Sequence, residues 1–95
     1  MFKIHEPFNS VMTIEFVDVD GHSINTVLEN LKDKETLNIS GKILGHPREI
    51  FTLVEYCRKN NIKCCLLPDS DIYDEEIKMA LDPYTYEYVE VIRRQ

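Results

Sequence analysis

The chain has 95 residues, 43% of them hydrophobic and 29% charged, and a formal net charge of −6 at pH 7. This composition is typical of one small globular domain, residues 1–95, and excludes a wholly disordered chain. With no apolar run of 18 residues, no apolar secretion signal and only three cysteines, we expect no membrane contact, no secreted disulfide framework and a cytoplasmic location.

The first part of the chain predicts a strand followed by a helix. Residues 11–19 alternate apolar positions on one face and carry valines on the other, which is typical of a strand covered on both faces. Residues 2–6 are compatible with an antiparallel edge strand beside it. An Asp-Gly turn then leads to a helix over residues 23–31, where Ser23 can cap the N-terminus.

The middle of the chain repeats the same order. Residues 36–39 predict a short strand, and Pro47 occupies the favoured first position of a second helix. From Ile50 onward apolar residues recur at helical spacing, widened by Phe51, and two asparagines follow the helix. Residues 62–67 then predict an apolar strand.

The last third predicts one more helix and one more strand. The helix opens at residues 69–71, has acidic residues in its first turn and ends at Pro83. Residues 84–92 alternate with a period of two, which predicts a final strand. The chain therefore favours an α/β fold with three or four mostly parallel strands and about three helices. The alternative is an α+β ferredoxin-like sheet.

The loop between the second strand and second helix is a candidate anion-binding site. Its residues are Gly41, Lys42, Gly45, His46 and Arg48. Backbone N–H groups at a helix start can hold a phosphate, and three cationic side chains would add positive charge. The pattern is neither a P-loop nor a dinucleotide fingerprint, so an ordinary loop before a capped helix is the alternative.

No catalytic or metal-binding set can be assembled from this sequence. Cys64 and Cys65 are adjacent on a strand and cannot both face Cys57, so we expect buried thiols and no metal cluster. Asp18, Asp20 and His22 could bind a divalent metal, but solvated turn residues explain them better, because Asp-Gly is the commonest turn dipeptide. We therefore expect no cofactor and no enzymatic activity.

The most distinctive feature is an acidic segment with interleaved tyrosines. Residues 66–90 contain eight acidic residues and one lysine, a balance of −7. On a strand, Tyr84, Tyr86 and Tyr88 would lie on one face with Glu90. Tyrosines are enriched at interfaces, whereas a tyrosine cover over the sheet beside a solvated helix face is the alternative.

This segment predicts a binding surface for a protein with a basic, nucleic-acid-handling surface. The expected contact residues are Tyr84, Tyr86, Tyr88, Glu90, Asp74, Glu75 and Glu76. An acidic domain competes with nucleic acid for a cationic groove, so we expect an inhibitor or regulator of the phage anti-defence or host-takeover type, with no direct nucleic-acid binding. A homodimer through the last strand is also compatible with the tyrosine row.

The stretch LNISGKILGHPREIFTLV, together with the following IKCCLLP at residues 62–68, resembles the anti-sigma-factor antagonist (STAS) family. The resemblance covers about a third of the chain and consists of a strand ending near Ser-Gly, a loop, a helix and a strand. It implies a partner-switching regulatory domain. Where the family has its phosphorylatable serine at the helix start, this chain has His46 to Glu49.

Overall fold

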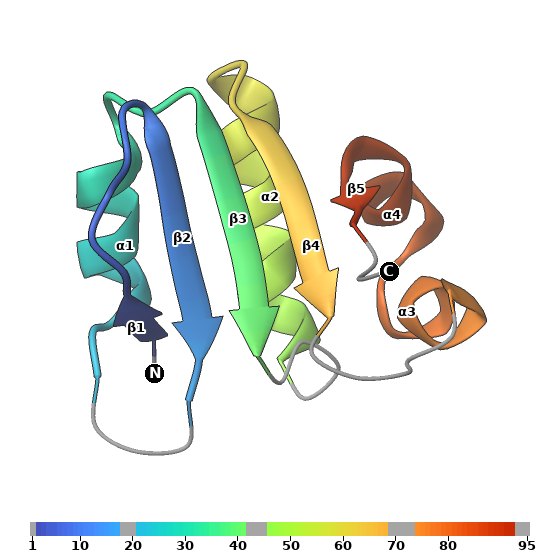
Figure 1. Ribbon diagram of the computed structural model, residues 1–95. Helices are drawn as coiled ribbons and strands as arrows, with labels where there is room; N and C mark the ends of the chain where they lie inside the picture. The colour runs from blue at the N-terminus through green and yellow to red at the C-terminus, as the bar shows by residue number, and fades with distance from the viewer. Residues whose placement is uncertain (1, 18–20, 42–45, 69–73, 93–95) are drawn as a thin grey trace.

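The computed structural model describes residues 2–17, 21–41, 46–68 and 74–92, and these contain five strands and four helices (Figure 1). The elements in chain order are β1 (Phe2–Ile4), β2 (Val11–Phe16), α1 (Ile24–Leu31), β3 (Thr36–Gly41), α2 (Pro47–Lys59), β4 (Lys63–Pro68), α3 (Asp74–Ala80), α4 (Pro83–Tyr88) and β5 (Glu90–Val91).

The five strands form one mixed sheet in the order β1-β2-β3-β4-β5. β1 is antiparallel to β2, and β2 to β5 are parallel to one another. The prediction of a mostly parallel α/β sheet is therefore confirmed in outline, with one more helix than expected, and β1 is the antiparallel edge strand with which residues 2–6 were compatible. The ferredoxin-like alternative is not observed.

The sheet is covered by α1 and α2 on one face only. Each crossover from β2 to β4 advances by one strand, and right-handed crossovers that advance in one direction place their helices on the same side (Figure 1). Met12, Ile14 and Phe16 of β2 are buried on that side, whereas the residues between them are half-buried. The expectation that the strand at residues 11–19 is covered on both faces is therefore wrong.

The helix signals in the first two thirds of the chain are confirmed. The Ser23 hydroxyl accepts a hydrogen bond from the Thr26 backbone N–H at 3.4 Å at the start of α1. α2 begins at Pro47 and packs its apolar stripe, Ile50, Leu53, Val54 and Cys57, against the sheet. Asn61 follows α2 with a φ of 58°, the left-handed conformation that asparagine tolerates.

The C-terminal part differs from the prediction. Residues 84–92 were expected to form a strand, but α4 occupies Pro83–Tyr88 and only Glu90–Val91 pair with the sheet. Asp82 has an extended conformation and caps α4, and Pro83 takes the first helical position. Proline thus starts a helix here instead of only ending the one before it. The predicted helix opening at residues 69–71 lies outside the described residues.

The outer edge of β1 is paired with the chain that precedes α1. The Phe2 N–H donates to the His22 carbonyl at 2.9 Å, and the His22 N–H donates to the Phe2 carbonyl at 2.8 Å. Gly21 permits this approach, because a Cβ there would lie 2.6 Å from the Phe2 carbonyl oxygen.

Candidate functional site: a groove between α2 and α4

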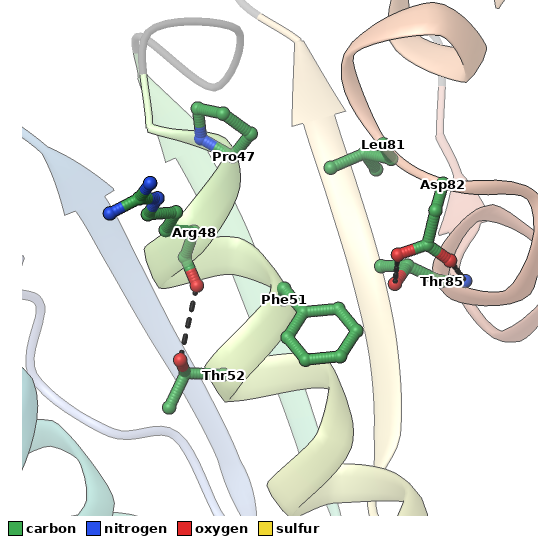
Figure 2. A pocket seen from close by; sticks show the side chains of 7 residues that line it. All are labelled: Pro47, Arg48, Phe51, Thr52, Leu81, Asp82 and Thr85. Carbon is green, nitrogen blue, oxygen red and sulfur yellow. Dashed lines mark hydrogen bonds between the residues drawn. The ribbon is translucent and has the colours of Figure 1, made fainter.

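A groove of about 500 Å³ separates the N-terminal half of α2 from the start of α4 (Figure 2). Its lining residues are Pro47, Arg48, Phe51, Thr52, Leu81, Asp82 and Thr85. Phe51 and Leu81 are its large apolar residues, and charged groups stand on both walls. The groove can therefore accept an apolar side chain with polar groups beside it.

Phe51 projects from α2 toward α4 and has 43% of its surface exposed. The sequence pattern placed this residue on the edge of the buried stripe, and that expectation is wrong because the buried residues of α2 are Ile50, Leu53, Val54 and Cys57. A second hollow lies between α1 and α2, and Phe51 and Thr52 border both hollows. Phe51 is thus an apolar ridge between two depressions.

The opposite wall is built by the cap of α4. Asp82 accepts the Thr85 backbone N–H at 2.8 Å and the Thr85 hydroxyl at 3.0 Å. The Thr85 N–H is the main cause that holds the pKa of the Asp82 carboxyl below its usual range. Thr85 is 1% exposed, so this wall is rigidly tied to the body of the protein.

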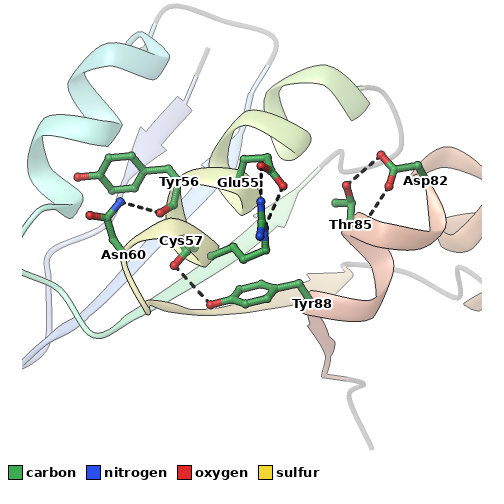
Figure 3. A network of polar contacts seen from close by, with 8 residues as sticks. Glu55, Tyr56, Cys57, Asn60, Asp82, Thr85 and Tyr88 are labelled. Carbon is green, nitrogen blue, oxygen red and sulfur yellow. Dashed lines mark hydrogen bonds and ion pairs between the residues drawn. The ribbon is translucent and has the colours of Figure 1, made fainter.

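Tyr88 and Tyr84 attach α4 to α2 and the turn after it, and Figure 3 shows the Tyr88 contact. The Tyr88 hydroxyl donates to the Ile62 carbonyl at 2.8 Å, and it also lies 3.4 Å from the Cys57 carbonyl. Burial raises the pKa of the Tyr88 phenol. The Tyr84 ring lies 4.9 Å from the guanidinium carbon of Arg58, a cation–π contact.

Arg58 itself is fixed by a two-point ion pair with Glu55. Its Nε and Nη2 donate to the two Glu55 carboxylate oxygens at 3.2 and 2.9 Å. This pairing lowers the pKa of Glu55 and raises the pKa of Arg58. Arg58 is therefore held in place beneath the Tyr84 ring.

The predicted tyrosine row does not exist as a row. Tyr84 and Tyr88 lie one helical turn apart and contact α2 and the turn after it, whereas the Tyr86 ring lies 5.7 Å from the Lys78 ammonium. The three tyrosines share one face only if residues 84–92 are extended, and residues 83–88 are helical instead. In this structure all three tyrosines make contacts within the protein that help to hold α4 in place.

The predicted acidic contact residues are dispersed. Glu90 lies on β5 and pairs with the Lys63 ammonium at 3.0 Å, which raises the pKa of Lys63. Glu76 is exposed on α3. Asp74 and Glu75 belong to the first turn of α3, but their side chains lie outside the described part of the structure.

The predicted anion-binding loop is described only at its two ends. Gly41 ends β3 with a φ of 87°, and a Cβ there would lie 2.6 Å from the Phe16 carbonyl oxygen. The His46 ring stacks on Phe16 with centroids 4.7 Å apart, and Arg48 lines the groove. Lys42 and Gly45 lie outside the described residues.

The three cysteines are buried free thiols, as expected. The neighbouring Cys57 thiol, together with burial, raises the pKa of Cys64. Cys65 points to the other face of the sheet. Among the described residues no group of three or more metal-binding side chains comes together, and Asp18 and Asp20 lie outside them.

The sequence did not predict the groove because Pro83 was interpreted only as the end of the preceding helix. Asp82-Pro83 followed by Thr85 has the form of an N-cap, a first-position proline and a third residue that the cap can bind. Pro47 likewise takes the first position of α2. The equivalent position of Pro83 predicts a helix after residue 82 instead of a strand.

Searches against protein-family models, curated proteins and solved structures found no match. Within the described residues, none of the helices has the length and apolar character needed to cross a membrane.

Proposed function

We propose that this protein is a non-catalytic protein-binding module and that its binding site is the groove between α2 and α4. The observation that carries the proposal is the exposure of Phe51 between two hollows, opposite Leu81 on the far wall. A large aromatic side chain that the fold leaves half-exposed beside a depression is typical of an interface anchor.

The walls of the groove are suited to recognition. Asp82 and Thr85 are held by their mutual hydrogen bonds, and the Glu55–Arg58 ion pair fixes the surface next to them. Because these groups do not need to be ordered on binding, this protein loses less side-chain conformational entropy when a partner binds here. The groove supplies the apolar anchor and the fixed polar rim that protein interfaces combine.

The partner class follows from charge. Leu81, Asp82 and Thr85 of the groove belong to the segment of residues 66–90, which has a balance of −7 in the sequence, so we expect a partner with a basic surface at the groove. A nucleic-acid-handling protein fits that description. The protein would then act as an inhibitor or regulator that competes with nucleic acid for the basic surface, in the manner of phage anti-defence proteins.

The test is a comparison of two phenylalanine variants in capture experiments from the native host. Phe51→Asp places a charge in the groove, and Phe8→Asp makes the same change at the exposed turn between β1 and β2, where Phe8 is 76% exposed. We expect partners bound by the wild type and by the Phe8 variant to be lost with Phe51→Asp. Added salt should weaken the wild-type complex. Retention of the same proteins by folded Phe51→Asp contradicts the proposal.

A second candidate function is supported by Arg48. Arg48 lines the groove in the first turn of α2, and the His46 side chain makes no capping hydrogen bond to that turn. A regulatory domain that binds a phosphate or nucleotide there, or a STAS-like partner-switching domain, would use the same end of α2. A thermal-shift screen with nucleotides and phosphorylated metabolites tests it, because specific binding raises the melting temperature. Stabilisation that is lost in Arg48→Gln would favour this candidate.

A further inference from the structure

In the part of the chain that the structure describes, no helix covers the face of the sheet opposite α1 and α2 (Figure 1). Its side chains come from alternate positions of all five strands and are Lys3, Val11, Thr13, Glu15, Thr36, Asn38, Ser40, Lys63, Cys65, Leu67 and Glu90. Those at its centre are half-buried or, at Cys65, buried. This open face is independent of the α2–α4 groove, which lies on the helical side.

The centre of the open face is neutral, and two of its polar side chains are hydrogen-bonded within the sheet. Asn38 donates to the Thr13 hydroxyl at 3.4 Å, and the Ser40 hydroxyl donates to the Ile14 carbonyl at 3.0 Å. Small polar groups that have partners within the face cost little to bury. Cys65 and Leu67 add apolar surface beside them, so the centre has the depletion of charge that is typical of an interface core.

Both lateral edges of the open face carry one acidic and one basic residue. Lys3 and Glu15 are opposite each other on β1 and β2, where Glu15 also lies 3.4 Å from His5 Nε2, and Lys63 pairs with Glu90 across β4 and β5. The two lysines and two glutamates sum to zero charge. The chain as a whole has a net charge of −6, but this face has none. The open faces of two copies therefore do not repel each other through their own charges.

We propose that the open face binds the open face of a second copy of this chain. A two-fold axis along the strands would place the Lys3–Glu15 edge of one copy over the Lys63–Glu90 edge of the other, so opposite charges can pair at both borders. The two sheets would pack face to face with their strands roughly aligned. A basic partner or nucleic acid fits less well, because the face offers neither a negative nor a positive field.

This dimer would have a functional consequence that rests on the proposed function. The α2–α4 grooves would lie on the two outer sides of the sandwich, so the dimer would present two binding sites to one partner assembly. Two linked sites raise the apparent affinity without any new contact.

The test is the mass of the protein in solution as a function of concentration. Sedimentation of the wild type from about 5 µM to about 500 µM should show a rise from the 11.2 kDa monomer toward twice that mass. Asn38→Lys adds a charge at the centre of the face and should weaken the dimer at least about tenfold. Asn25→Lys makes the same change on the exposed side of α1 and should leave the dimer intact.

Two further readouts keep the test independent of any one variant. Thr13→Lys is a second central change that should also give a folded monomer. Carbodiimide crosslinking of mixed labelled and unlabelled wild-type protein should join Lys3 or Lys63 of one copy to Glu15 or Glu90 of the other. A wild type that stays monomeric throughout, a dimer that persists in both folded central variants, or intermolecular crosslinks confined to the helices would overturn the proposal. Because Phe51→Asp does not touch this face, loss of the binding function and loss of the dimer can be told apart.

Discussion

Residues 11–68 and residues 74–92 use different means to stay folded. The first region alternates strands and helices, and residues such as Leu37, Ile39 and Leu53 are completely buried at regular spacing. The second region consists of a seven-residue helix, a six-residue helix and a two-residue strand. Ile77 and Leu81 bury this region in the common core, and the contacts of Tyr84, Tyr88 and the Asp82 cap add to that attachment. Regular apolar patterning therefore specifies the first region, whereas two apolar anchors and individual polar contacts specify the second.

The largest expected effect belongs to the first region. Ile39→Ala removes a fully buried side chain from the central strand and should lower the free energy of unfolding by about 2–5 kcal/mol. Urea denaturation followed by circular dichroism measures it. Ile39→Val is the matched control and should cost about 0.5–1.5 kcal/mol. Equal losses for both variants would mean that the core does not depend on this contact in the way the structure indicates.

A smaller effect is expected from the attachment of α4. Tyr88→Phe keeps the ring but removes the hydroxyl that donates to the Ile62 carbonyl at 2.8 Å. The loss should be about 0.5–1.5 kcal/mol, and hydrogen exchange should increase mainly in α4 and β5. If exchange increases equally across β2 and β3, the two regions form one cooperative unit and the contrast drawn above is wrong.

The smallest expected effect is a pH dependence confined to the start of α4. The pKa of Asp82 is lowered in the folded state from its ordinary value of 3.8, so the carboxylate stabilises the cap above that pH and loses this contribution as the pH falls below it. Near-ultraviolet circular dichroism of the tyrosines, recorded from about pH 6 to about pH 2.5, should show the change. Asp82→Asn retains a capping side chain without a titrating group. A tyrosine transition that is identical in this variant would refute the assignment to Asp82.

The sequence was sufficient for the region where local pattern and tertiary environment agree. Ser23, Pro47 and the asparagines after α2 mark their helix ends by local backbone chemistry, and the predicted bounds of β3 and β4 differ from the observed ones by only one or two residues. The face of the sheet that stays open was not predictable in the same way. Val11 and Val17 give β2 apolar character on both sides, and only the direction of the crossovers decides which side receives helices.

The prediction for the C-terminal part was wrong for a different reason. Tyrosine favours strands by intrinsic propensity, and Tyr84, Tyr86 and Tyr88 have a period of two, so propensity and pattern agreed on a strand. The helix forms because Asp82 caps it, Pro83 starts it, and Thr85 is buried against the rest of the fold. The groove then depends on how α2 and α4 pack, which no local pattern in the sequence contains.

The pairing of Phe2 with His22 bears on how this protein behaves at high concentration. An unpaired strand edge can template the addition of further strands from other molecules, which leads to aggregation. Here the backbone groups of Phe2 that face away from β2 are already bonded to residue 22, and Gly21 lets the chain come close enough to do so. The turn before α1 thus protects the first residue of the β1 edge, and we expect Gly21→Ala to disturb this bridge and leave that edge more open to strand addition.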